Sequence, residues 1–269
     1  MSVRVVGPLE ERLRANRDAG RKLLVPYVTA GLDEGWLDIV RAVAAAGADA
    51  VEIGIPFSDP VMDGPVIQEA SVRALARGTT PASVLAELAR ADVEVPLAVM
   101  TYVNLFAHAG YHRMAQSLAA AGVSGAILPD LPIDEAAEWM SEAEAAGVDA
   151  VQLVAPTTPE GRLLRICEAS HGFVYAVGLL GVTGERADVA NSALVIARRC
   201  RSVTETPVLV GVGVTTPKQA VTISEESDGV VVGSALIRRL LNGEGPEGAG
   251  AFIGSLREAL DDRWPGTQE

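Results

Sequence analysis

Short apolar segments recur along the chain and alternate with longer segments in which apolar and polar positions follow a helical period. The alternation predicts repeated strand–helix units and a parallel sheet. Eight apolar segments have the length of buried strands, and they are residues 23–28, 48–53, 96–102, 125–128, 150–154, 173–177, 207–212 and 229–233. Helical patterns between them include residues 35–46, 81–91, 111–121, 134–146 and 159–169.

Several residues mark where these helices should begin and end. Gly47, Gly122 and Gly147 each follow an alanine and precede a strand, where a left-handed glycine can stop a helix. Thr80 and Asp134 are expected to be N-caps. No long polar or Pro/Ser-rich stretch interrupts the series, so we expect one domain over residues 1–269.

Eight such units can form either a closed barrel or an open doubly wound sheet. The first strand is not followed by Gly-x-Gly-x-x-Gly, which disfavours the dinucleotide-binding version of the open sheet. A chain of 269 residues suits a single barrel. We therefore predict an α/β fold, a (β/α)8 TIM barrel with extra short helices, whose site lies in the loops after the strands.

Composition excludes several classes of partner and argues against a metal site. The formal charge is −13, from 35 acidic and 22 basic residues without a basic run, which argues against nucleic acid and anionic membranes. The N-terminus has no signal-peptide pattern and no window is apolar enough to span a membrane, so we expect a cytoplasmic protein. Cys167 and Cys200 are expected to be reduced packing residues. The three histidines, His108, His112 and His171, lack metal-ligand spacing, so no metal site is predicted.

Glu52 is the first candidate for chemistry. Alternation along the second strand puts Val51 and Ile53 towards the helices, and Ala50 and Glu52 towards the barrel interior. A desolvated carboxyl group has a raised pKa and can donate and accept a proton near neutral pH. A buried glutamate paired with a basic residue is the structural alternative.

The loop after this strand presents two more carboxylates, Asp59 and Asp63, between prolines. A second carboxylate at the mouth could accept a hydrogen bond from a substrate N–H and stabilise positive charge developing there. Aspartate before Pro or Gly is also ordinary turn chemistry, so both readings stay open. Tyr102 and Tyr175 lie at the ends of the third and sixth strands with their side chains expected inward.

Three glycine-bearing loops follow the late strands. Backbone N–H groups there, together with the N-terminus of a short helix starting near Ser234, are a recurrent way for barrels to hold phosphate without Lys or Arg. Each glycine loop alone would also fit a tight turn. The loops are residues 181–184, 211–214 and 233–235.

The segment from Glu52 through Asp63 to Gln68 resembles the signature of tryptophan synthase alpha subunits. Further matching segments follow in family order along almost the whole chain, and they are residues 129–132, 181–184, 211–213 and 233–235. The resemblance implies a lyase that splits indole-3-glycerol phosphate into indole and glyceraldehyde 3-phosphate, with Glu52 as general acid/base and Asp63 as its partner carboxylate. It also implies that the substrate is bound by Tyr175, Thr183, Gly184, Gly211, Gly213, Gly233 and Ser234.

The same resemblance implies a partner and a place for the cofactor. The family's beta subunit uses pyridoxal phosphate and receives indole from the alpha subunit, so no cofactor is expected in this chain, and an alpha2beta2 heterotetramer is expected. The contact would involve Asp59, Tyr102, Asn104, Asp130 and Pro132.

Three alternatives remain open from the sequence. A free-standing lyase would release indole for specialised metabolism without a beta subunit. A barrel that binds a phosphorylated ligand but is catalytically weakened would bind without turnover. An isomerase barrel of tryptophan or histidine biosynthesis would share the glycine loops, but it does not account for residues 52–68.

Overall fold

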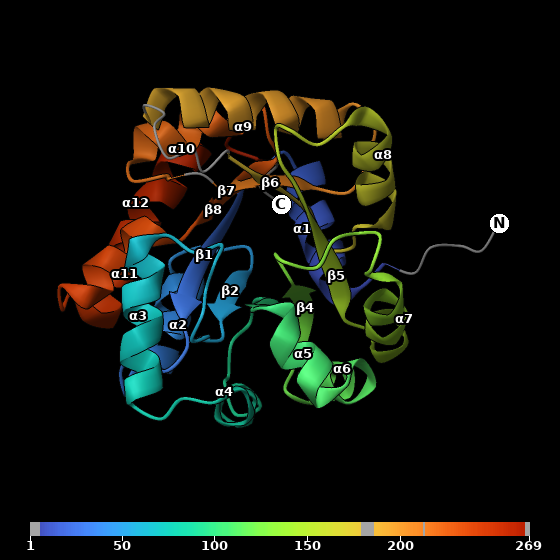
Figure 1. The fold of residues 1–269 in the computed structure, drawn as a ribbon. Helices are drawn as coiled ribbons and strands as arrows, with labels where there is room; N and C mark the ends of the chain where they lie inside the picture. The colour runs from blue at the N-terminus through green and yellow to red at the C-terminus, as the bar shows by residue number, and fades with distance from the viewer. Residues whose placement is uncertain (1–5, 179–185, 212, 267–269) are drawn as a thin grey trace.

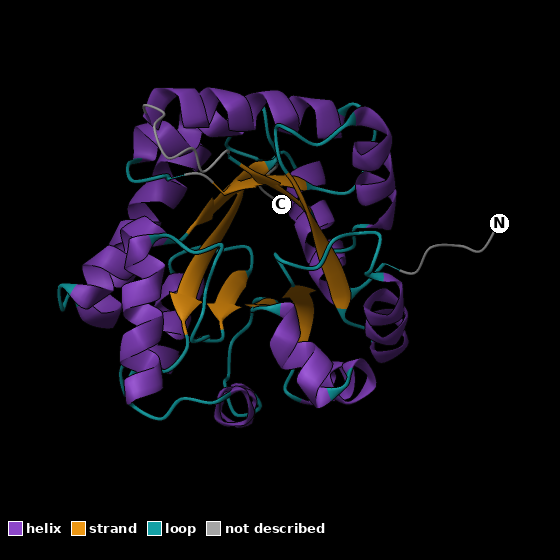
Figure 2. Ribbon diagram, in the orientation of Figure 1, coloured by secondary structure: helices purple, strands orange, loops and turns teal. Residues whose placement is uncertain are grey.

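Eight parallel strands close into a barrel in a computed structural model that describes residues 6–178, 186–211 and 213–266, without the side chains of 186–191. The strands run in sequence order around the barrel and helices surround them (Figures 1 and 2). The predicted (β/α)8 barrel is confirmed. The strands are β1 Leu23–Thr29, β2 Val51–Gly54, β3 Leu97–Met100, β4 Val123–Ile127, β5 Asp149–Val154, β6 Val174–Val177, β7 Val208–Gly211 and β8 Gly229–Val232.

The five helices expected from their pattern are present, with others that the pattern did not single out. Among the latter, α1 precedes the first strand, and the short α5 and α11 follow β3 and β8. None of the described helices is both long and apolar enough to cross a membrane. The helices are α1 Pro8–Asp18, α2 Trp36–Ala45, α3 Pro65–Ala76, α4 Pro81–Leu88, α5 Val103–Ala109, α6 Tyr111–Ala120, α7 Ala137–Ala146, α8 Glu160–Ala169, α9 Arg186–Arg201, α10 Pro217–Ser224, α11 Ser234–Leu241 and α12 Gly245–Arg263.

The predicted helix ends are mostly confirmed. Thr80 caps α4 by accepting a hydrogen bond from the Ser83 N–H, with the reciprocal bond completing a capping box. The three glycines at helix ends have positive φ, as a left-handed stop requires: Gly47 +97°, Gly122 +74° and Gly147 +73°.

The prediction that Asp134 is an N-cap is wrong. Helix α7 begins at Ala137 with Ala136 at the capping position. The Asp134 carboxylate instead accepts hydrogen bonds from Arg162 and Arg165 of α8. The carboxylate pairs with two guanidinium groups at once, so the side chain serves the contact between this segment and α8.

Alternation along the strands divides the core into two clusters. Val51 and Ile53 belong to the larger cluster between strands and helices, whereas Ala50 belongs to the cluster inside the barrel. This is the orientation that the sequence predicts for β2. Cys167 and Cys200 are buried free thiols between the strands and the helices, as expected.

Helix α1 closes the N-terminal end of the barrel, and Figure 1 shows it inside the ring formed by the other helices. Leu9 and Leu13 are fully buried in the inner cluster, and each such leucine contributes about 1.5–3 kcal/mol. A Cβ atom at Gly125 of β4 would lie only 2.5 Å from Leu9 Cδ2, so glycine is needed there for the plug to fit.

Three aspartates at the beginnings of strands tie this end together. Asp49, before β2, accepts from the Leu24 N–H of β1 at 2.7 Å. Asp149, at the start of β5, accepts from the Glu10 N–H of α1 at 3.0 Å, and Asp228, before β8, accepts from the Val208 N–H of β7 at 2.8 Å. Asp49 and Asp228 thus satisfy N–H groups of the strands, and Asp149 satisfies an N–H group in the first turn of α1 that has no partner within the helix.

Candidate active site

Glu52 lies inside the barrel near the C-terminal end of β2. Its side chain is 1% exposed, and neither carboxyl oxygen has a hydrogen-bond partner among the described residues. Burial, and secondly the nearby charge of Asp63, raise the pKa of Glu52 to about 8. The alternative of an ion-paired structural glutamate therefore has no support in the described part of the chain.

Asp63 lies in the loop between β2 and α3. Burial raises its pKa to about 6, while a hydrogen bond with the Tyr102 side chain acts in the opposite direction. The loop is held by the Gln68 side-chain amide, which donates to the Asp63 carbonyl at 2.9 Å. Proline at the first position of α3 fixes where the loop ends.

Tyr102 supports this loop from the end of β3. Its hydroxyl accepts a hydrogen bond from the Met62 N–H at 2.9 Å, and its ring stacks on Phe57 with centroids 5.0 Å apart. The side chain is 4% exposed. Tyr102 therefore positions the loop that carries Asp63, a role that sequence analysis did not give it.

Tyr175 of β6 faces the same interior. Burial raises its pKa well above the usual value, and Glu52 is the next cause. Its ring lies over Gly211 at the end of β7, where any Cβ atom would overlap the ring. Gly211 is thus required by the close approach of Tyr175, rather than by a turn.

Tyr27 of β1 is a site residue that sequence analysis missed. It is the register partner of Glu52, and the charges of Asp63 and Glu52 are among the causes that raise its pKa. The signal was available, because Tyr27 shares the inward parity of Leu23 and Val25 on its strand. Three of the four tyrosines of the chain thus surround the two carboxyl groups.

The glycine loops of β7 and β8 border the same mouth. Gly213 has a positive φ of 43°, and Gly233 is the N-cap of α11, which begins at Ser234. Among the described residues no side chain caps this helix, so its first N–H groups suit an anion. Two further expected residues, Thr183 and Gly184, lie outside the described residues.

Residues expected at a partner contact differ in accessibility. Asp59, Asn104 and Pro132 are exposed. Asp130 is half-buried and its carboxylate accepts from the Val103 N–H at 2.8 Å, which anchors the start of α5 beside Tyr102.

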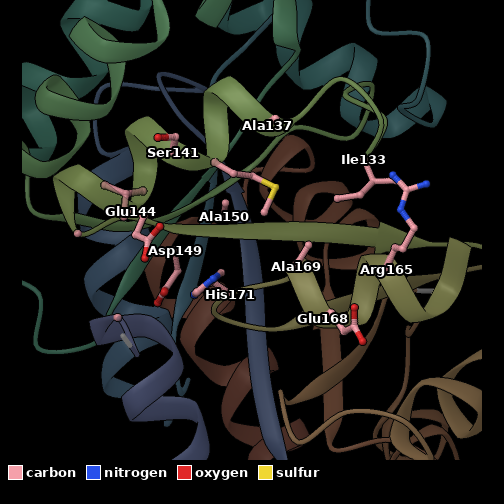
Figure 3. A pocket seen from close by; sticks show the side chains of 14 residues that line it. Ile133, Ala137, Ser141, Glu144, Asp149, Ala150, Arg165, Glu168, Ala169 and His171 are labelled. Atoms are coloured by element: carbon pink, nitrogen blue, oxygen red, sulfur yellow. The ribbon is translucent and has the colours of Figure 1, made fainter. Parts of the chain in front are cut away.

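A separate hollow of about 550 Å³ lies between α7, α8 and the beginning of β5 (Figure 3). At one end of the hollow Asp149 and His171 lie close together. One carboxylate oxygen of Glu10, one of Asp149 and a ring nitrogen of His171 lie within 4.8 Å of one another. The Glu10 carboxylate accepts from Arg14 and from the Gly172 N–H. This cluster anchors α1 beneath the barrel, at the end remote from Glu52.

The two carboxyl groups at the mouth favour different protonation states at neutral pH. With pKa values of about 8 and about 6, Glu52 is mainly protonated and Asp63 mainly ionised. An acid beside a carboxylate, two strands away from a helix N-terminus suited to phosphate, can protonate one part of a phosphorylated ligand while stabilising positive charge on another.

Comparison with known proteins identifies close relatives. A family model described as tryptophan synthase alpha chain matches residues 13–252. The chain is 44% identical to the tryptophan synthase alpha chain of Halorhodospira halophila, with 96% of this chain and 98% of the relative covered. It is also 44% identical to that of Thermobifida fusca, with 87% and 89% covered.

Solved structures give the same result. Mycobacterium tuberculosis tryptophan synthase matches with a TM-score of 0.88 and 37% identity, covering 95% of this chain and 99% of that one. Tryptophan synthase subunit alpha from Legionella pneumophila matches with a TM-score of 0.86 and 32% identity, covering 96% and 100%.

Proposed function

The chain belongs to the tryptophan synthase alpha chain family, indole-3-glycerol-phosphate lyases of tryptophan biosynthesis, and we propose that Glu52 and Asp63 perform its cleavage reaction. The observation that carries this proposal is the pair of buried carboxyl groups with raised and unequal pKa values at the barrel mouth. Such a pair provides an acid and a charge stabiliser in one site.

The reaction is a retro-aldol cleavage in which the proton returns to its donor. Protonated Glu52 delivers its proton to C3 of the indole ring, and ionised Asp63 accepts a hydrogen bond from the ring N–H and stabilises the cation that forms. The Glu52 carboxylate then removes the proton of the C3′ hydroxyl. The C3–C3′ bond breaks, its electrons restore the aromatic ring, and indole and glyceraldehyde 3-phosphate are released.

The remaining groups bind and enclose the substrate. Gly213, Gly233 and Ser234 hold the phosphate, and Gly184 contributes from the loop after β6. Tyr175 and Gly211 border the reacting centre, and the sequence resemblance assigns Thr183 to substrate binding. Tyr175 and Gly211 are supported by their contact at the mouth, whereas Thr183 and Gly184 rest on the sequence resemblance.

The experiment that tests this assignment measures indole formation from indole-3-glycerol phosphate by the wild type, Glu52→Gln and Asp63→Asn. Both variants should lose turnover by orders of magnitude while keeping the fold. A Glu52→Gln enzyme that works at the wild-type rate would contradict the mechanism.

The partner in this proposal is a pyridoxal-phosphate-dependent beta chain, in an alpha2beta2 complex, and the cofactor belongs to that chain. Support comes from the exposed Asp59, Asn104 and Pro132 near the barrel mouth. Val61 and Met62 of the Asp63 loop are exposed apolar residues beside Asp59, which suits a protein contact.

Adding a family beta chain should produce a complex on size-exclusion chromatography and stimulate indole formation. An Asn104→Asp variant should weaken both responses, and a matched Asn242→Asp variant at the end of α11 should weaken neither. Absence of stimulation would favour the free-standing lyase.

A further inference from the structure

Strand β1 lies between the two ends of the proposed substrate site. In the closed barrel β1 pairs with β8 on one side and with β2 on the other. The phosphate-binding residues Gly233 and Ser234 follow β8, and Glu52 lies on β2. A ligand whose phosphate lies at Gly233 and Ser234 and whose reacting carbon lies at Glu52 must therefore cross the C-terminal end of β1.

The inner face of β1 presents two hydroxyl groups at this crossing. Leu23 and Val25 point into the inner cluster, and Tyr27 and Thr29 continue the same alternation. Tyr27 is 5% exposed and Thr29 is fully buried. Both side chains are thus part of the enclosed site and not of the outer surface.

Contacts at two glycines locate the Tyr27 side chain. A Cβ atom at Gly233 would lie 3.6 Å from Tyr27 Cβ, so the side chain starts beside the phosphate end. A Cβ atom at Gly54 would overlap the Tyr27 hydroxyl, so the side chain ends over β2, two residues beyond Glu52. The ring thus spans the interval between the phosphate site and the acid.

Polar atoms at this place lack partners. Both Glu52 carboxyl oxygens are buried and have no hydrogen-bond partner within the described chain, and the Thr29 hydroxyl has no partner of regular geometry there, with only the Tyr27 hydroxyl near enough to interact with it. A buried polar atom left in this state costs about 1–3 kcal/mol, which a ligand can recover by bonding to it. The end of β1 is therefore a polar site prepared for a hydroxylated group.

We propose that the hydroxyl groups of Tyr27 and Thr29 bind the C2′ hydroxyl of indole-3-glycerol phosphate. The inference rests on the proposed roles of Glu52, Gly233 and Ser234. Those roles engage the C3′ hydroxyl and the phosphate, and the C2′ hydroxyl is the group between them. Each protein hydroxyl can donate or accept, so one donates to the substrate oxygen while the other accepts its hydrogen. Tyr27 and Thr29 thereby select for a glycerol chain.

The test compares two substrates, indole-3-glycerol phosphate and its 2′-deoxy analogue, in Tyr27→Phe and Thr29→Val. Both substitutions remove a hydroxyl group with little change in volume. With the glycerol substrate each variant should lose about tenfold in kcat/KM, the scale of one hydrogen bond. With the deoxy analogue each should lose less than about twofold, so the preference for the glycerol chain should fall by about fivefold or more.

Tyr111→Phe is the matched control, because Tyr111 is the one tyrosine away from the carboxyl groups of the mouth. Its preference between the substrates should equal that of the wild type, and thermal unfolding should show all three variants folded. Equal losses on both substrates in Tyr27→Phe and Thr29→Val would overturn the inference alone. A wild-type chain that cleaves neither substrate would contradict the proposed function, and the inference with it.

Discussion

The two ends of the barrel both bury carboxyl groups, but they surround them differently. Asp49, at the N-terminal end, accepts hydrogen bonds from the Leu24 N–H, Asn16 and Arg21, and Arg257 lies 3.4 Å away. Glu52 is three residues further along the same segment and has no such partner in the described chain. Strand direction and the alternation of side chains along the segment together place Asp49 in a structural anchor and Glu52 in the barrel mouth.

The difference shows how one physical effect serves two purposes. Burial is the largest cause raising the pKa of both groups. Around Asp49, two arginines, the Leu24 N–H and Asn16 act against it. Around Glu52 the next cause is another negative charge, Asp63, which acts in the same direction as burial. At Asp49 the arginines and N–H donors thus offset part of the effect of burial, although its pKa is still raised, whereas at Glu52 both causes favour the neutral acid.

The largest expected effect comes from Glu52→Gln, which should abolish the chemistry at the C-terminal end of the barrel and leave the contacts of Asp49 at the N-terminal end intact. Turnover should fall by at least two to three orders of magnitude, roughly 3–4 kcal/mol in the barrier, because the amide cannot shuttle a proton. Steady-state indole formation measures this.

A stability measurement on the same variant separates chemistry from folding. The raised pKa means that wild-type stability declines as pH rises from 4.5 to about 8, since folded Glu52 keeps a proton that the unfolded chain loses. In denaturant titrations Glu52→Gln should lack the part of the decline that Glu52 contributes and keep the part below about pH 6 that comes from the raised pKa of Asp63. Unfolding of the variant at pH 7 would contradict a purely catalytic role.

Asp49→Asn should produce the opposite result, because it should lower the stability of the fold and leave the activity nearly unchanged. Arg257 is 7% exposed, and removing the negative charge leaves its guanidinium buried without that partner. The free energy of unfolding should fall by about 3 kcal/mol, measured in urea. The value of kcat, measured well below the unfolding temperature, should stay within about twofold, and a hundredfold loss would show that the two ends are not independent.

The pH dependence of kcat/KM should be bell-shaped, with limbs near pH 6 and pH 8. Below about 6 Asp63 gains a proton and loses its charge, and above about 8 Glu52 loses the proton that it must donate. Each limb should fall about tenfold per pH unit. Asp63→Asn should move the alkaline limb to lower pH, because the Asp63 charge helps to raise the pKa of Glu52. A flat profile between pH 5 and 9 would rule out both assignments.

The smallest effect is expected from Tyr102→Phe, which keeps the ring on Phe57 and removes the bonds to Met62 and Asp63. The loss should be about 1 kcal/mol, or roughly fivefold in kcat. Because this hydrogen bond lowers the pKa of Asp63, the acid limb should shift to higher pH. An unmoved acid limb would mean that Tyr102 acts on the partner contact and not on Asp63.

The barrel and the direction of Glu52 could be predicted because each depends on local alternation. Period two along β2 sorts Ala50 inward and Val51 outward without reference to distant residues. The loop carboxylate Asp63 was found because it follows a strand at the end where barrel sites lie.

What escaped prediction depends on contacts between distant parts of the chain. The fit of Leu9 against Gly125, and the bond from the Glu10 N–H to Asp149, join residues more than 100 positions apart. Asp134 was misassigned because its arginine partners lie on the next helix. Tyr27 was overlooked because its importance comes from the neighbouring strand. The roles of Thr183 and Gly184 stay predictions.

Because Leu9 and Leu13 of α1 fill its N-terminal end, the barrel is open only at its C-terminal end. Substrate, indole and glyceraldehyde 3-phosphate must then all enter or leave through the open C-terminal end of the barrel. A protein bound at that end would control both substrate entry and product release, so turnover can be regulated without any change to the groups at the site.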